Sequence, residues 1–376
     1  MSAHLMRGRM RGLSLIEVMI ALLIGSILLL ALVQVFSASR AASQTSEGMA
    51  RVQENARFAM DYLQRDLRMA GHFGCVNDQA HLLTPGALVN HTAASAGFPV
   101  SIRGYDATGS APGGSINLAT PAAGWTPGLP TAFDDLGALA GSDIIELRYL
   151  GNQGVPVSTI THPTTSSTLI SVPPARWNAL TTDGVANPTM FGIADCTFAD
   201  LFPASAVNAT GGTVTLNATI DRYTPQPAGQ TMLYRAESLV YYVAPGAGGG
   251  RSLWRARADN SGAYPATGRE ELVEGIESLQ FIYGLDRVTT VDTTAPSGYI
   301  DGYRSASTIT DTAEQWRRVG TVQVGILASS PNRAASAQPT TNRQVMGVAF
   351  APPTGDTHFR ATYETTVALR NRLFGN

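Results

Sequence analysis

The sequence contains no lysine, so all 26 of its basic side chains are arginines, and 28 acidic residues leave a net charge of −2. Charged residues make up 14 % of the chain, well below the roughly 25 % of an average soluble domain. Without a lysine amine, the chain cannot form a standard phosphate-binding loop or a catalytic Schiff base. The near-neutral charge argues against general nucleic-acid binding through a basic face.

Cysteine is also scarce, because Cys75 and Cys196 are the only two. Two cysteines are too few for a disulfide scaffold or for a cysteine-only zinc site. A disulfide between them is the default in an oxidising compartment, where closing a loop of about 100 residues adds at most roughly 4.7 kcal/mol. The N-terminus described below indicates such a compartment, so we expect the disulfide, with two unpaired buried thiols as the alternative.

The sequence lacks the common catalytic and metal-binding motifs. It has six histidines, at His4, His72, His81, His91, His162 and His358. None of them forms an H-E-x-x-H pair, and there is no G-x-S-x-G turn or EF-hand loop. The acidic pairs Asp134-Asp135 and Glu270-Glu271 are adjacent, a spacing that does not aim two carboxyls at one point. We therefore expect no enzyme, cofactor or metal site, although calcium binding in an aspartate-containing loop stays open.

A long apolar run stands near the N-terminus. Residues Leu13 to Phe36 include four polar side chains, which are Ser14, Glu17, Ser26 and Gln34. As a helix, 24 residues span roughly 36 Å, enough to cross a hydrocarbon core of about 30 Å. The preceding arm carries three arginines and no acid, which predicts that it stays in the cytoplasm. The rest of the chain would then lie across the membrane, in a bacterial periplasm.

Two ordinary interpretations of this run compete with a functional one. A secretory signal peptide would be cut after Ala38 or Ala42, but its apolar core is normally shorter. A plain membrane anchor would explain the length of the run but not Glu17. An ionisable side chain at the centre of a spanning helix costs about 2.5–3.5 kcal/mol. Glu17 therefore suggests a positively charged partner on another chain.

The segment Arg11 to Leu22, RGLSLIEVMIAL, resembles the leader of type IV prepilins and of type II secretion pseudopilins. The resemblance implies that a prepilin peptidase cuts between Gly12 and Leu13 and that the new Leu13 amine is methylated. It also implies that Glu17 pairs with the amine of a neighbouring subunit during assembly. Residues 1–12 would be the cytoplasmic leader, and residues 13–36 the membrane-spanning half of a long helix.

No proline interrupts the chain before Pro85, so the helix can continue beyond the membrane. A single apolar stripe at helical spacing predicts that it reaches Met69, near a stop at Gly71, with residues 37–71 as its periplasmic half. The stripe consists of Val52, Ala56, Ala59, Leu63 and Leu67. The charged residues Arg51, Glu54, Arg65, Asp66 and Arg68 lie off it, which indicates a solvated face at least as strongly as a partner contact.

Two further segments narrow the resemblance. The phrases DLRMAGHFGC at Asp66 to Cys75 and YETTVALRNR at Tyr363 to Arg372 are similar to the PilW group of minor pilins. This implies an α+β type IV pilin fold, in which the long helix packs on an antiparallel β-sheet head at residues 72–376. The middle of the chain carries no such resemblance.

Within the head, β-rich runs separated by turn-rich stretches predict strands. They lie at 143–150, 213–220, 233–243, 252–258, 278–283, 318–327 and 358–369. Residues 272–277 are predicted to form a short helix, an order also found in J-type pseudopilins. Residues 76–142 are predicted to form a loop-rich insertion, which is either a recognition surface or a merely tolerated addition.

The resemblance implies a minor pilin that primes type IV pilus assembly and sits in a tip complex by subunit–subunit binding. Its partners would be other minor pilins, the major pilin and the prepilin peptidase, with a tip adhesin as a further candidate and no nucleic acid. It would be held in the inner membrane with its head in the periplasm, and then enter the fibre. One alternative is a minor pseudopilin of type II secretion. Another is a membrane-anchored periplasmic adhesin or enzyme.

Overall fold

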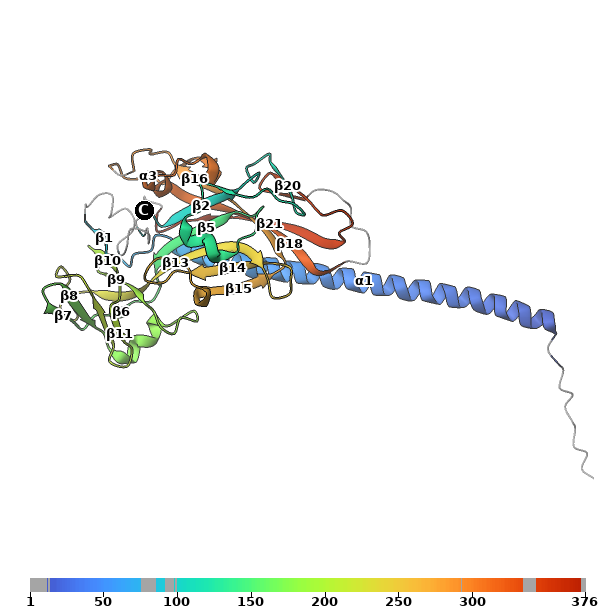
Figure 1. The fold of residues 1–376 in the computed structure, drawn as a ribbon, viewed down its shortest axis with the longest axis horizontal. Helices are drawn as coiled ribbons and strands as arrows, with labels where there is room; N and C mark the ends of the chain where they lie inside the picture. Colours follow the sequence, from blue (N-terminus) through green and yellow to red (C-terminus); the bar gives the residue numbers. More distant parts are fainter. Residues whose placement is uncertain are drawn as a thin grey trace, which may run out of the picture.

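The computed structural model describes residues 12, 14–75, 86–91, 98, 100–291, 293–333 and 343–372. In this part of the chain, one long helix, α1 (Leu15–Met69), runs into a head built mostly of strands. The second half of α1 lies along the head, and its first half projects away from it (Figure 1). This is the expected α+β, pilin-like organisation.

The predicted apolar stripe is confirmed, because its five side chains are fully buried against the head. The helix ends where a glycine stop was expected. Gly71 has a φ of +76°, a left-handed conformation that glycine adopts without steric cost. One part of the expectation is wrong, since Asp66 is buried rather than solvated.

A four-stranded antiparallel sheet packs directly on α1. Its order is β17 (Ile300–Arg304), β16 (Ile276–Asp286), β18 (Val319–Arg333) and β21 (His358–Ala368). The alternating residues of β16, β18 and β21 that face α1 share one apolar core with the helix stripe. Burial of that core, rather than helix propensity, is what fixes the second half of α1 to the head.

A ten-stranded sheet forms the other wall of this core. Its main path runs β1 (Leu88–Asn90), β10 (Ala199–Pro203), β9 (Met190–Ala194), β13 (Met232–Pro245), β5 (Ile144–Leu150), β2 (Ile102–Ala107) and β4 (Trp125–Thr126). Off this path, β14 (Arg251–Arg257) pairs with β13 and with β15 (Arg269–Glu274), and β6 (Val155–Pro156) pairs with β13. Asp66 of α1 contacts Tyr241 of β13 and Arg255 of β14.

A smaller unit lies at the end of the head away from the projecting helix (Figure 1), where it shares a second apolar core with β9, β10 and β13 of the large sheet. Its sheet has the order β11 (Ala206–Asn208), β12 (Thr213–Leu216), β8 (Ser167–Ser171) and β7 (Thr159–Thr164). The 3-10 helix η3 (Pro174–Leu180) adds Trp177 and Leu180 to that core. A fourth sheet, of three strands, joins β19 (Arg343–Val345), β20 (Val348–Ala351) and β3 (Ser115–Asn117).

All seven predicted runs contain strands, but the predicted helix at residues 272–277 is wrong. That segment is the end of β15 and the start of β16, and the chain passes from one sheet to the other at Gly275. Gly275 has a φ of +74°, its N–H donates to the Arg251 carbonyl at 2.9 Å, and its own carbonyl accepts from the Ser329 N–H at 2.7 Å. These long-range backbone hydrogen bonds stabilise an extended conformation here, although the local sequence predicts a helix.

The expected loop-rich insertion at residues 76–142 is only partly confirmed. Residues 76–85, 92–97 and 99 lie outside the described residues. Short strands do occur, but β2 is almost wholly buried and pairs with β5 inside the large sheet. The expectation of antiparallel pairing also has two exceptions, because β1 with β10 and β20 with β3 are parallel.

Candidate functional site

The projecting half of α1 exposes a continuous apolar surface. Every large apolar side chain from Leu15 to Phe36 is exposed, and the most apolar 18-residue window has a mean hydropathy of 2.8 with no part buried. Among the described residues, α1 is the single helix that is long and apolar enough to span a membrane. A surface of this size needs lipid or other apolar helices around it.

Glu17 lies in the first turn of this exposed helix. Within the described part of the chain, its carboxylate has no hydrogen-bond or ion-pair partner. A carboxylate in the first turn interacts favourably with the positive end of the helix dipole, but that does not replace a countercharge in lipid. Gly12 is exposed, whereas Leu13 and residues 1–11 lie outside the described residues.

The other end of α1 is joined to the head by buried charges. Asp66 accepts hydrogen bonds from the Tyr241 hydroxyl at 2.5 Å and from Arg255 Nη1 at 3.0 Å. All three side chains are buried, and Arg255 also pairs with Glu270. Burial, together with the charge of Asp66, raises the pKa of Tyr241 well above its usual range. The phenol therefore stays protonated and donates to Asp66.

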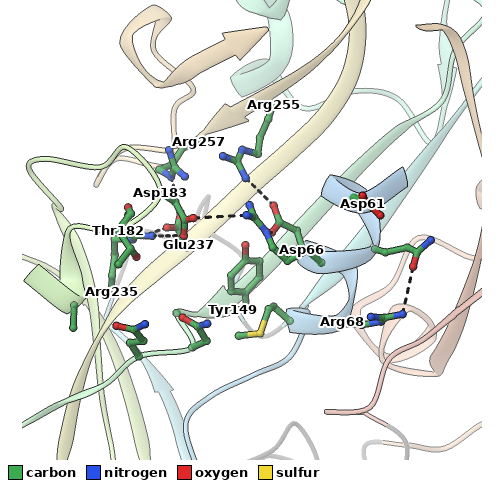
Figure 2. Close-up of a pocket in the computed structure, with 17 residues that line it drawn as sticks. Asp61, Asp66, Arg68, Tyr149, Thr182, Asp183, Arg235, Glu237, Arg255 and Arg257 are labelled. Carbon is green, nitrogen blue, oxygen red and sulfur yellow. Dashed lines mark hydrogen bonds and ion pairs between the residues drawn. The ribbon is translucent and has the colours of Figure 1, made fainter. Parts of the chain in front are cut away.

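A second ion-pair cluster lies beside the first, on β13 and β14 (Figure 2). Glu237 pairs with Arg235 at 2.5 Å and with Arg257 at 2.7 Å, and it is buried. Asp183 pairs with Arg235 at 3.5 Å and with Arg65 of α1 at 3.7 Å. Arg65 also reaches Asp66 at 3.1 Å, so the two clusters form one network across the helix–head boundary.

These clusters line a cavity of about 390 Å³ between the end of α1, β13, β14 and the Thr182–Asp183 turn. Each buried charge on its wall already has an opposite charge within ion-pair distance. A buried charge without a partner would be strongly destabilising, whereas a paired and hydrogen-bonded one fixes geometry. The arrangement therefore orients the head relative to the helix.

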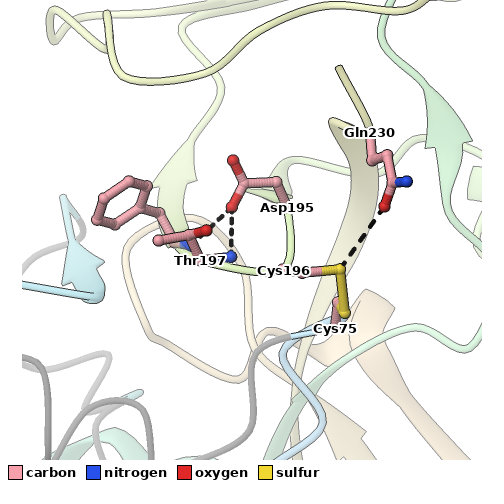
Figure 3. Close-up of a disulfide and its surroundings, with 6 residues drawn as sticks. Cys75, Asp195, Cys196, Thr197 and Gln230 are labelled. Atoms are coloured by element: carbon pink, nitrogen blue, oxygen red, sulfur yellow. Dashed lines mark hydrogen bonds between the residues drawn. A yellow bond between two sulfur atoms is a disulfide. The ribbon is translucent and has the colours of Figure 1, made fainter.

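The structure joins Cys75 and Cys196 in a disulfide, with Cα atoms 4.5 Å apart and 121 positions between them (Figure 3). Cys196 lies in the turn between β9 and β10. That turn is held by Asp195, whose carboxylate accepts from the N–H groups of Thr197 and Phe198, both at 2.7 Å. The disulfide thus ties the segment that leaves α1 to the turn between β9 and β10 of the large sheet.

The remaining residues considered from the sequence have structural contacts. His72 Nδ1 lies 2.8 Å from the Leu150 carbonyl oxygen, and His91 Nε2 lies 2.6 Å from Asp200. His162 contacts Thr168, and His358 pairs with Asp356. His4 and His81 lie outside the described residues. No group of three or more metal-ligating side chains occurs in the described ranges.

Of the two adjacent acidic pairs, Glu270 and Glu271 make contacts that stabilise the fold. Glu270 pairs with Arg255, and Glu271 accepts from Ser252 Oγ at 2.7 Å and from the Ala247 N–H at 2.9 Å. Asp134 lies in the 3-10 helix η2 (Thr131–Leu136), where it is exposed together with Asp135. The Glu270 and Glu271 carboxylates therefore bind different partners rather than one common point.

Sequence reasoning missed the ion pairs that join helix and head, which are Asp66 with Arg255 and Arg65 with Asp183. A partial signal existed, because the helical position of Asp66 flanks the apolar stripe rather than opposing it. Its partners lie 175 and 189 positions away. No local pattern indicates such a distant pairing.

Two family models match the chain. Residues 240–371 match the Type IV Pilus-assembly protein W family, PilW, and residues 7–33 match the prokaryotic N-terminal methylation motif. The first match covers the strands from the end of β13 to β21, and the second spans residues 12, 13 and 17. Together they support a PilW-type, prepilin-like minor pilin. No curated protein and no solved structure matches the chain.

Proposed function

We propose that this chain, a PilW-type pilin related to the type IV pilus, primes pilus assembly as part of a minor-pilin complex at the fibre tip. Before assembly it is held in the inner membrane by residues 13–36, with residues 37–71 and the head, 72–376, in the periplasm. PilW pilins are structural rather than catalytic. The activity proposed is accordingly subunit binding, with other minor pilins and the major pilin as partners.

The observation that carries this proposal is the exposed apolar half of α1 with one carboxylate in its first turn. The same surface suits two successive surroundings, lipid before assembly and neighbouring apolar helices afterwards. Because both surroundings are apolar, transfer from one to the other does not require the helix to enter water.

Processing supplies the countercharge for Glu17. Cleavage between Gly12 and Leu13 by the prepilin peptidase gives each subunit a new α-amine one helical turn before its own Glu17. In an environment of low dielectric, an unpaired carboxylate and an unpaired ammonium are both costly. A neighbour's Leu13 amine beside Glu17 removes both costs, and the pair fixes the axial position of the entering subunit.

The size and position of the head indicate that few copies of this subunit enter each fibre, outside its repeating body. The head contains two large sheets packed on one core and, at the end away from the projecting helix, an additional unit with a second apolar core (Figure 1). A bulky end of this kind is accommodated most easily where no subunit lies above it, which is the tip.

The experiment replaces Glu17 by Gln, which keeps the size of the side chain and removes its charge. We expect normal cleavage and normal membrane levels, but loss of the protein from sheared pili and loss of pilus initiation. Asp301→Asn, an exposed charge removal on β17 of the head, serves as the control and should assemble normally. Normal incorporation of the Glu17 variant would contradict the proposal. The proposal would also be contradicted if deleting the gene for this chain blocked protein secretion but left pili intact.

A further inference from the structure

The face of α1 that points away from the head carries a stripe of exposed charges. Eight of the nine charged residues between positions 37 and 71 belong to it, and Asp66 is the buried exception. The stripe consists of Arg40, Glu47, Arg51, Glu54, Arg57, Asp61, Arg65 and Arg68, all exposed. Their successive spacings of 7, 4, 3, 3, 4, 4 and 3 positions keep them on one side of a helix.

The signs along this charge stripe alternate without a break from Arg40 to Arg65. Glu47, Glu54 and Asp61 are each seven positions apart, which corresponds to about 10.5 Å along the axis. Between each acid and the next lies an arginine, roughly 5 Å from both along the axis. A second helix that lies alongside this stripe can place either opposite or like charges beside it. The contact is then attractive in the first case and repulsive in the second.

Among the described residues, the middle of the charge stripe is only partly neutralised. Glu47 and Arg51 form an ion pair at 3.1 Å, and Arg65 turns toward Asp66 and Asp183. Glu54 and Asp61, by contrast, have no ion-pair partner in the described part of the chain.

Two neighbouring side chains complete this open section of the stripe. The Arg57 guanidinium lies 5.0 Å from the ring centroid of Phe58. Phe58 itself is 41 % exposed on the same face. The open section therefore combines unpaired charges with an aromatic contact point.

We infer that the charge stripe binds the periplasmic part of a parallel helix from a different pilin subunit, whose charges have the opposite order at the same height. The inference rests on the proposed function, because a common membrane anchor is what makes the helices parallel. A partner helix with the opposite order of charges places an acidic side chain beside each arginine of the stripe. A partner helix with the same order places like charges together and is repelled. Screening limits the effect to helices in close contact, since the Debye length is about 8 Å at physiological ionic strength.

A second copy of this chain does not fit the same role. Two copies anchored at equal depth would place Glu54 beside Glu54 and Arg57 beside Arg57, and repulsion against a wrong partner is an effective source of specificity. The stripe therefore disfavours side-by-side self-association before assembly. It selects a partner with complementary charges, as e and g positions do in coiled coils.

The test uses the full-length protein in cells that make the pilus. A photoreactive benzoylphenylalanine at position 58 should cross-link to the long helix of a different pilin, identified by mass spectrometry of the cross-linked peptide. The double variant Glu54→Arg with Arg57→Glu keeps the net charge but places like charges together at positions 51 and 54 and at 57 and 61. We expect it to lower the cross-link yield at least about fivefold.

The matched control is Glu54→Asp with Arg57→Lys, which keeps the order of signs and should leave the yield unchanged. Protein level and the Cys75–Cys196 disulfide report folding in both variants. A cross-link mainly to a second copy of this chain, to no pilin helix, or with a yield indifferent to the swapped signs would overturn the inference. If Glu17→Gln still abolishes incorporation in that case, the proposed function stands and only the charge-stripe inference fails.

Discussion

Asp66 and Arg255 meet in the core at 3.0 Å although 189 positions separate them in the sequence. Asp66 comes from the last turns of α1 and Arg255 from β14, so their contact joins the helix to the head. Tyr241 is a second donor to the same carboxylate. Specific polar contacts, and not apolar packing alone, therefore fix the orientation of the head relative to α1.

Removing this carboxylate should destabilise the head. Asp66→Ala leaves the buried Arg255 guanidinium without its partner from the helix, and breaking a buried pair in this way costs about 3 kcal/mol or more. Asp61→Ala, on the exposed face of the same helix, removes a carboxylate without an ion-pair partner in the described residues and should change stability by less than about 0.5 kcal/mol. Urea unfolding of the detergent-solubilised protein measures both. Equal midpoints for the two variants would refute this role of Asp66.

The disulfide gives an independent prediction. Opening the loop of 121 positions by Cys75→Ser with Cys196→Ser should lower the free energy of unfolding, by up to about 4.7 kcal/mol in the chain-entropy model. Because both cysteines are exposed at the surface, the serines bury no unsatisfied polar group. Denaturation under oxidising and reducing conditions measures the effect. The double variant should match the reduced wild type, and a large difference between them would contradict this account.

Acid should weaken the contact around Asp200. Hydrogen bonds from His91, Tyr223 and Arg222 outweigh burial and lower the pKa of its carboxyl. A lowered pKa means that the stabilisation is fully present above the unfolded value of about 3.9 and is lost as the pH falls below it.

The measurement is the difference in unfolding free energy between wild type and Asp200→Asn. We expect about 2 kcal/mol at pH 7, shrinking steadily below about pH 4. The same comparison for Asp301→Asn, an exposed site on β17, should give a value near zero at every pH. An Asp200 difference that is constant from pH 7 to pH 3 would show that the lowered pKa does not contribute.

Gly104 has a tight steric role in β2. A Cβ there would lie 1.9 Å from the Tyr283 hydroxyl oxygen, and Tyr283 is fully buried. Gly104→Ala should therefore cost about 1–3 kcal/mol through overpacking. Gly302→Ala is the control, since its nearest neighbour would be 3.6 Å away at the end of Arg304. Thermal unfolding distinguishes the two, and a Gly104→Ala protein as stable as the control would be inconsistent with the close contact.

The parts of this structure that the sequence predicts are those encoded by local periodicity. The stripe from Val52 to Leu67 specifies which face of α1 is buried, and alternating apolar residues locate the principal strands. The prediction of a helix at residues 272–277 was wrong because the conformation of Gly275 depends on distant backbone partners. The prediction that Asp66 is solvated was wrong because its burial depends on Tyr241 and Arg255, which no local pattern connects to it.

The charge stripe likewise combines a feature that the sequence predicts with one that only the structure shows. The sequence analysis placed four of its residues off the apolar stripe, and all four are exposed: Arg51, Glu54, Arg65 and Arg68. Asp66, which was placed with them, is buried. Which of them lack a partner became apparent only from the packed head, because Asp183 neutralises Arg65 while nothing in the described chain reaches Glu54.

The most direct test of the central claim is the intact mass of the protein purified from cells with and without prepilin peptidase. With the peptidase, the account predicts a chain that begins at Leu13 and carries one methyl group on its amine. Without it, the chain should keep residues 1–12 and stay out of the fibre. A mature protein that begins at any other residue would contradict the account, because the amine that pairs with Glu17 would then be in the wrong place.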